Sequence, residues 1–142
     1  MTGQRTIGVD IDVLRRAIVA ASDGHRAARA FATRLSAGLE TYAVAAPAVV
    51  ALADILVRDG ARPAWALDRA GDVLEMCRVL DVRDSDVAEG LEIATATGAS
   101  PRVATTGAVF ARHGIATVVS FEREVELVPH LRRLPPDALD EL

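Results

Sequence analysis

Two acidic residues follow the first apolar segment of the chain and have the chemistry to hold a metal ion. The sequence VDIDV (9–13) places Asp10 and Asp12 among branched apolar residues, directly after TIG (6–8). Alternate residues of an extended chain point the same way, so the two carboxylates are expected to lie side by side. Clustered carboxylates repel one another unless a cation neutralises them, and hard oxygen ligands of this kind suit Mg²⁺ or Mn²⁺.

Glu122 is the first candidate to join this pair. It follows IATVVS (115–120), a β-branched run that is typical of a buried strand. Asp10 likewise follows a short apolar strand, at 6–9. The carboxyl ends of parallel strands meet at one edge of a sheet, so Glu122 is expected at the same edge as Asp10.

Asp54 is a further candidate, on a predicted helix. It lies in APAVVALADILV (46–57), on one helical face with Val50 and Val57, which would turn it towards the interior. The alternative is an exposed ion pair with Arg58, four residues further on, which would stabilise the helix only slightly.

The elements that must position these acids are short strands alternating with helices. The pattern predicts strands at 6–9, 79–82, 115–120 and 131–134, and helices at 13–21, 25–37, 47–58, 64–78, 85–97 and 101–113. This alternation favours an α/β fold, a three-layer α/β/α sandwich with a short, mostly parallel central sheet. Ligands of such sheets bind beyond the carboxyl ends of the strands, where the strand order reverses.

Composition limits the possible classes of protein. A chain of 142 residues, half hydrophobic and with a net charge of −4, fits one globular domain, expected over 1–135, with an acidic tail at 136–142 that frays. No apolar run is long enough to cross a membrane and the N-terminus resembles no signal peptide, so a cytoplasmic protein is expected. The single Cys77 excludes an internal disulfide and is expected to be buried.

Three segments carry a resemblance to a known family. VDIDVLRRAI (9–18) looks like the strand-then-helix start of the PIN domain, and PAVVALADIL (47–56) resembles the helix that carries its second acid. RVATTGAVFARHGIATVVSFEREV (102–125) is similar to its final helix, strand and turn, including the step Gly114-Ile115 and the run Glu122-Arg123-Glu124. Within the PIN-domain family, the chain resembles the VapC-type toxins of toxin–antitoxin pairs. The resemblance covers about 6–135 and is most specific at the C-terminal end.

The resemblance implies roles for individual residues. Asp10, Asp54 and Glu122 would be the catalytic metal ligands, with Mg²⁺ or Mn²⁺ as the cofactor. Asp12 stands where the family has a polar residue that orders the turn. Independently of the resemblance, Ser120 ends a predicted strand and is expected to orient Glu122 or a metal-bound water molecule.

One position departs from the family pattern. The family usually begins its penultimate helix with Arg-Asp-Ala, whose Asp is a metal ligand, whereas this chain has Arg102-Val103-Ala104. A valine binds no metal, so the site is expected to be weakened. Asp12 is the residue that could replace the lost charge.

Two functions from different classes follow. The first is a VapC-like, metal-dependent endoribonuclease, the toxin of a toxin–antitoxin pair, with RNA, an antitoxin and a second copy of the chain as partners and with Arg15, Arg102 and Arg123 as RNA contacts. The second is a catalytically inactive PIN-fold module that binds or regulates. An unrelated small α/β ligand-binding domain stays open only if the acids prove to lie far apart.

Overall fold

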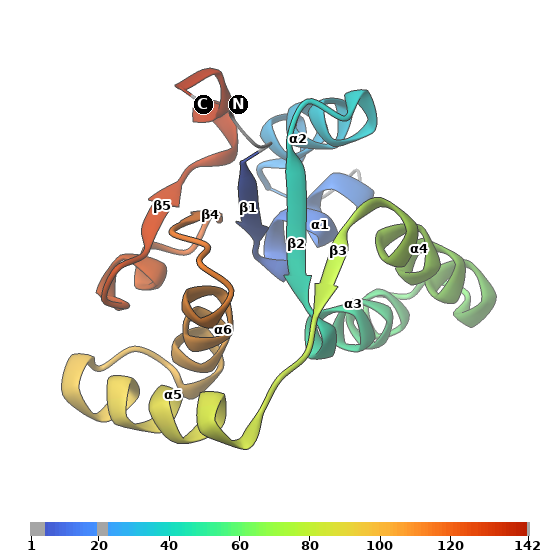
Figure 1. Cartoon of the computed structure of the whole chain (residues 1–142). Helices are drawn as coiled ribbons and strands as arrows, with labels where there is room; N and C mark the ends of the chain where they lie inside the picture. The colour runs from blue at the N-terminus through green and yellow to red at the C-terminus, as the bar shows by residue number, and fades with distance from the viewer. Residues whose placement is uncertain (1–4, 20–22, 142) are drawn as a thin grey trace.

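The central element of the fold is a five-stranded sheet. The computed structural model of the chain describes residues 5–19 and 23–141. The strands are β1 (Thr6–Val9), β2 (Thr41–Ala45), β3 (Arg78–Leu80), β4 (Thr117–Val119) and β5 (Arg132–Leu134). They lie in the order β3-β2-β1-β4-β5, and all four pairings are parallel (Figure 1). The order reverses at β1, because the chain runs from β1 to β2 on one side and returns to β4 on the other.

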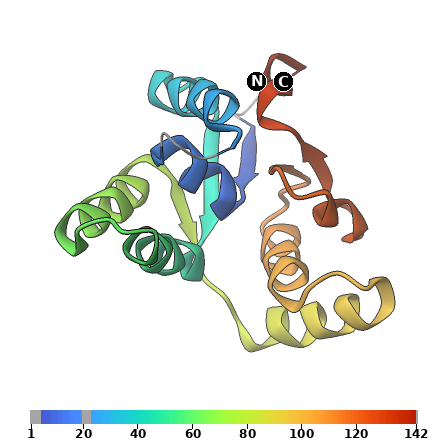
Figure 2. The ribbon, with the colours of Figure 1, turned by 180° about the vertical axis from the view of Figure 1, so that it is seen from behind.

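Helices cover both faces of this sheet. The α-helices are α1 (Ile11–Ile18), α2 (His25–Ala37), α3 (Ala46–Arg58), α4 (Pro63–Met76), α5 (Asp84–Thr97) and α6 (Pro101–Arg112), and two 3₁₀ helices follow, η1 (Arg123–Leu127) and η2 (Pro136–Glu141). In the view of Figure 2, α1 to α4 lie on the side of the sheet that faces the reader, while α5 and α6 extend to one side. The predicted three-layer α/β/α fold is confirmed.

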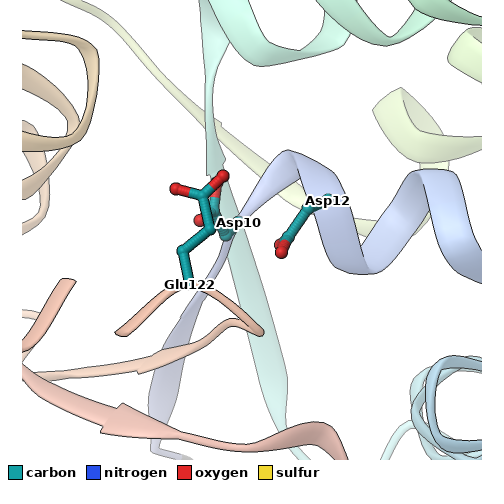
Figure 3. Close-up of side chains that lie close together, drawn as sticks. All are labelled: Asp10, Asp12 and Glu122. Atoms are coloured by element: carbon teal, nitrogen blue, oxygen red, sulfur yellow. The ribbon is translucent and has the colours of Figure 1, made fainter. Parts of the chain in front are cut away.

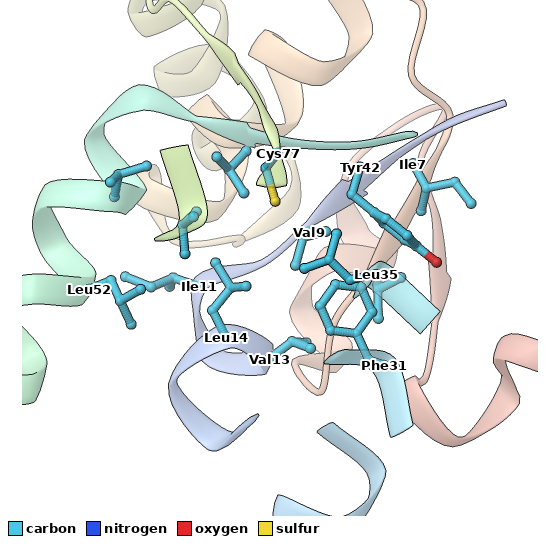
Figure 4. Packing of buried hydrophobic residues seen from close by; sticks show 14 of the residues in the cluster. Ile7, Val9, Ile11, Val13, Leu14, Phe31, Leu35, Tyr42, Leu52 and Cys77 are labelled. Atoms are coloured by element: carbon cyan, nitrogen blue, oxygen red, sulfur yellow. The ribbon is translucent and has the colours of Figure 1, made fainter. Parts of the chain in front are cut away.

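Side chains of the same strand alternate between two cores. Tyr42 and Val44 of β2 belong to the core under α1 to α4, which also contains Phe31 and Leu52 (Figure 4). Ala43 and Ala45 face the second core, under α6 and η1. Cys77 is 7% exposed within the first core, as expected for a small hydrophobic residue. Two apolar faces on one strand are what a sheet buried on both sides requires.

Close helix packing explains two glycines. A Cβ at Gly107, inside α6, would come within 2.6 Å of Val128, which follows η1. A Cβ at Gly90 of α5 would come within 2.6 Å of the Cα of Thr105 on α6. The two glycines therefore let α6 approach its neighbours closely.

Some predicted elements differ from the structure. The strand β2, TYAVA (41–45), has no counterpart among the predicted strands, and four of its five residues are buried in the sheet. The helix predicted at 13–21 begins earlier, at Ile11, and its last residues, 20 and 21, lie outside the described part of the chain. In the C-terminal segment, η2 forms over Pro136–Glu141, and Leu139 is only 5% exposed in the first core.

Within residues 5–19 and 23–141, no helix has the length and apolar character needed to cross a membrane.

Candidate metal centre

Asp10 lies at the carboxyl end of the central strand β1, where the strand order reverses. Its backbone N–H donates to the carbonyl of Val119 in β4 (3.0 Å), which fixes it between the two strands. Its side chain caps α1 by accepting a hydrogen bond from the N–H of Ile11 (2.8 Å). The residue is only 5% exposed. The reversal of strand order is the place where open parallel sheets bind ligands.

Ser120 connects this strand end to the next one. Its hydroxyl donates to Oδ2 of Asp10 (2.8 Å) and accepts from the backbone N–H of Glu122 (2.9 Å). The residue is fully buried, so both hydrogen bonds are shielded from water. Ser120 thus fixes the Asp10 carboxylate and the start of the turn that carries Glu122.

Three carboxylates meet at this edge. Each of Asp10, Asp12 and Glu122 offers an oxygen that lies within 4.8 Å of the oxygens offered by the other two. Figure 3 shows Glu122 overlapping Asp10 in the view and Asp12 beside them, on α1. Asp12 reaches this place from the first turn of α1, so the argument from an extended chain was wrong, although the two aspartates do lie together. The helix starts at Ile11 because Asp10 caps it.

The electrostatics of the cluster show the cost of bringing these acids together. Burial, together with the negative charges of Asp10 and Glu122, raises the pKa of Asp12 from its ordinary value of 3.8 to about 7. Burial and the charge of Asp10 also raise the pKa of Glu122. Three carboxylates in a partly desolvated site therefore resist full ionisation unless a cation joins them.

The residues present fit a divalent cation. Both carboxylate oxygens of Asp12 are buried, and neither has a hydrogen-bond partner among the described residues. Unsatisfied buried carboxylate oxygens are costly, and a hard cation such as Mg²⁺ or Mn²⁺ satisfies them directly. The donor set of oxygens alone, without His or Cys, is the one that these two ions prefer.

Arg102 already supplies one positive charge to the cluster. Its Nη2 donates to both carboxylate oxygens of Glu122 at 2.9 Å, and its Nη1 lies 3.4 Å from Oδ1 of Asp10. The sequence suggested Arg102 as an RNA contact, and the structure places its guanidinium on the acids. In this geometry it neutralises part of the charge that a metal ion would neutralise.

Asp54 is not one of the carboxylates that the structure brings together. It is exposed on α3, on the same stripe as Val50 and Val57, which are themselves 66% and 42% exposed. The apolar neighbours that suggested an inward position therefore belong to an outer face. The α3 residues that line the cavity beside Asp10 are Pro47, Ala48 and Ala51.

Val103 lies close to the acids but packs into the second core. It is 4% exposed and lines a small space together with Asp10 and Arg102. Ser100 caps α6 by accepting a hydrogen bond from the N–H of Val103 (3.3 Å). The first turn of α6 thus places an apolar side chain, where the family pattern has an acid, beside the carboxylates.

A cavity of about 370 Å³ adjoins the acids, and it was not anticipated from the sequence. Its walls come from the ends of β1 and β2 and from α3, α5 and α6, and include Ala48, Ala51, Val87, Leu91, Asp10 and Arg102. The signal that could have revealed it is the row of small residues on α3, one turn apart. A mainly apolar cavity next to a charged cluster lowers the local dielectric constant and strengthens the electrostatic interactions there.

The other two arginines proposed for RNA lie away from the carboxylates. Nε of Arg15 donates to Asp59 at 2.9 Å, in an ion pair that links α1 to the end of α3. Arg123 is exposed in the first turn of η1, directly after Glu122. Neither is part of the cluster of acids.

Comparison with solved structures identifies the fold. The toxin VapC20 of Mycobacterium tuberculosis, described as cleaving the sarcin-ricin loop, superposes with a TM-score of 0.71 at 22% identity, over 84% of this chain and 92% of that one. A toxin–antitoxin complex from Klebsiella pneumoniae gives a TM-score of 0.67 at 11% identity, over 92% and 97% of the two chains.

A third solved structure, VapBC2 of Rickettsia felis bound to a fragment of promoter DNA, gives a TM-score of 0.69 at 12% identity, over 92% of this chain and 98% of that one. No model of a protein family matches the sequence, and no curated protein sequence matches it. At these identities the likeness concerns the fold, and it agrees with the resemblance in the sequence. The chain has the PIN-domain fold of the VapC-type toxins.

Proposed function

We propose that this protein is a VapC-like toxin, a metal-dependent endoribonuclease whose metal centre is formed by Asp10, Asp12 and Glu122. The observation that carries the proposal is the meeting of these three carboxylates at the edge of the sheet where the strand order reverses. The fold shared with VapC toxins supports it. Mg²⁺ or Mn²⁺ bound there would activate a water molecule and shield the charge of an RNA phosphodiester.

The chain's own residues hold and orient the ligands. Asp10 is fixed from two sides, by the N–H of Ile11 and by the hydroxyl of Ser120. Glu122 is held at its backbone by Ser120. Asp12 contributes the two oxygens without a hydrogen-bond partner in the described chain, and so supplies a charge where the family's fourth acid is replaced by Val103. Fixed ligands keep the geometry that catalysis needs.

The partners of this function are RNA, an antitoxin and a second copy of the chain. Solved structures with this fold include toxin–antitoxin complexes, which supports an antitoxin partner. Apolar side chains on the outer faces of α3 and α4 support a homodimer; these are Val50, Val57, Trp65, Leu67, Leu74 and Met76, each at least 41% exposed. Arg15, Arg102 and Arg123 are the proposed RNA contacts. A cytoplasmic location follows from the RNA substrate.

A second candidate function is a catalytically inactive module that binds or regulates. The observation that favours it is the pairing of Arg102 with Glu122 and Asp10, because a guanidinium can neutralise the acids without a metal ion. The absence of a carboxylate at Val103 favours it as well. Under this function, divalent ions would not change the stability of the protein.

Cleavage of a structured RNA in the presence of Mn²⁺ separates the two functions. The native chain is expected to cleave, and Asp10→Asn is expected to lose cleavage, because an amide cannot supply the charge. Asn still caps a helix, so this variant keeps its fold. Glu75→Gln, exposed on α4, is the matched control that removes a carboxylate elsewhere. Equal cleavage by the native chain and Asp10→Asn would contradict the proposed site, and no cleavage by either would favour the inactive module.

A further inference from the structure

Arg102 extends from the first turn of α6 across the acidic cluster. Its Nη2 binds both oxygens of Glu122 at 2.9 Å, and Nη1 approaches Oδ1 of Asp10 at 3.4 Å. Its side chain is 51% exposed, whereas that of Asp10 is 6% exposed. A half-exposed cation therefore covers a buried carboxylate from the solvent side.

The contacts of Arg102 use oxygens that a metal ion would need. Oδ2 of Asp10 is taken by Ser120, and Oδ1 already accepts from the N–H of Ile11. The guanidinium occupies Oδ1 a second time and both oxygens of Glu122. A divalent ion coordinated by the same atoms would meet a positive charge within a few ångströms, and like charges in a partly desolvated site repel strongly.

Arg102 is free to leave without disturbing the fold. The next residue, Val103, is buried and keeps the first turn of α6 in place, so the position of the backbone does not depend on the guanidinium. The side chain itself is half exposed and borders the cavity beside Asp10. The ion pair can open towards solvent while the strand ends and α6 stay as they are.

We propose that Arg102 is a built-in competitor for the divalent cation, so that metal occupies the centre only when the guanidinium moves off Asp10 and Glu122. The inference rests on the proposed metal centre and adds its regulation. The affinity of the chain for the metal ion then depends on Arg102, a residue of α6. Any ligand that draws Arg102 away, such as an RNA phosphate, would raise that affinity, because an arginine fork binds phosphate and carboxylate alike.

The test is the affinity for Mn²⁺ alone, measured from the electron paramagnetic resonance signal of free Mn²⁺ at pH 8. Arg102→Ala is expected to bind Mn²⁺ at least about tenfold more tightly than the native chain, because it removes a charge that competes for the same oxygens. Arg102→Lys keeps the charge but loses the planar fork, and should fall between the two.

The matched control is Arg78→Ala. Arg78 is exposed at the start of β3, two strands away from β1 in the sheet, and its loss changes the net charge equally. This variant should bind Mn²⁺ like the native chain. A gain in affinity as large as that of Arg102→Ala would mean that net charge alone is responsible, and would overturn the proposal.

The remaining outcomes distinguish this proposal from the proposed function. If the native chain and Arg102→Ala bind Mn²⁺ equally, or Arg102→Ala binds it more weakly, while Asp10→Asn does not bind, the metal centre stands and the competition is refuted. If neither the native chain nor Arg102→Ala binds Mn²⁺, the metal centre itself fails, and the competition fails with it. Thermal unfolding of each variant in EDTA shows that it is folded in these measurements.

Discussion

Ser120 donates a hydrogen bond of 2.8 Å to the carboxylate of Asp10, although 110 positions separate the two residues in the chain. The bond joins the ends of β4 and β1, the two strands between which the order of the sheet reverses. The same hydroxyl accepts the backbone N–H of Glu122. One buried side chain therefore sets the distance between two of the three acids.

Ser120→Ala should lower both the stability and the metal affinity. It leaves a buried carboxylate oxygen and a backbone N–H without this partner, at a cost of about 1–3 kcal/mol in the free energy of unfolding. Urea unfolding measures the stability, and Mn²⁺ titration measures the affinity. Ser36→Ala, on the exposed face of α2, is the control and should change neither. A stable Ser120→Ala variant with native Mn²⁺ affinity would show that the hydroxyl does not position the acids.

The raised pKa of Asp12 predicts how stability depends on pH in the metal-free protein. The pKa is about 7 in the folded chain, against an ordinary value of 3.8, so the folded state holds a proton that the unfolded state has released between these two values. Stability from this group is present below about pH 4, falls as the pH rises towards 7, and then levels off.

Asp12→Asn tests this dependence because an amide does not titrate. In EDTA the variant should be more stable than the native chain at pH 8, and the difference should shrink towards pH 5. Thermal unfolding across this range measures it. A difference that is the same at pH 5 and pH 8 would show that Asp12 is not protonated in the folded protein near neutral pH.

Val103→Asp restores the acid that the family pattern has at this position. Without metal, a buried carboxylate beside Asp10 and Glu122 should destabilise the fold by at least about 2 kcal/mol. With Mn²⁺, the variant should regain more stability than the native chain does, because a fourth ligand joins the centre.

Val103→Asn is the matched control for that experiment, since asparagine has the shape of aspartate but carries no charge. It should be destabilised without a comparable response to Mn²⁺. Equal responses of the two variants would mean that position 103 does not reach the metal. RNA cleavage by Val103→Asp should exceed native cleavage if the lost ligand limits the activity.

Asp54→Asn separates the ligand set suggested by the sequence from the one in the structure. Because Asp54 is exposed on α3 and absent from the cluster, this variant should bind Mn²⁺ with native affinity. Glu122→Gln should weaken the binding by about tenfold or more, since it removes a charged ligand. Isothermal titration with Mn²⁺ compares them. Similar losses of Mn²⁺ affinity in both variants would show that Asp54 is a ligand of the metal centre.

The sequence predicted the parts of the fold that have strong local signals. Helix α6 has a capping Ser100, Pro101 at its first position and Gly114 after its end, and the structure confirms it. The ends of β1 and β4 were predicted because short β-branched segments are followed by acids. Strand β2 was missed because TYAVA (41–45) runs directly into the apolar helix α3, with no turn residue between them.

The site could be predicted only where the acids follow strands. Asp10 and Glu122 come together because strand order, not local sequence, places β4 next to β1. The orientation of Asp54 could not be read from its apolar neighbours, since Val50 and Val57 are also exposed. The contacts of Arg102 with Asp10 and Glu122 depend on its side-chain conformation, which cannot be predicted from the periodicity of the sequence.

The central claim is that Asp10, Asp12 and Glu122 form one metal centre, and anomalous diffraction from crystals grown with Mn²⁺ tests it most directly. Crystals of the native chain and of Arg102→Ala are both needed, because the guanidinium competes in the former. The account predicts an anomalous peak within coordination distance of all three carboxylates, stronger in Arg102→Ala, with Asp54 unengaged. The absence of a peak among these carboxylates in both crystals would contradict it.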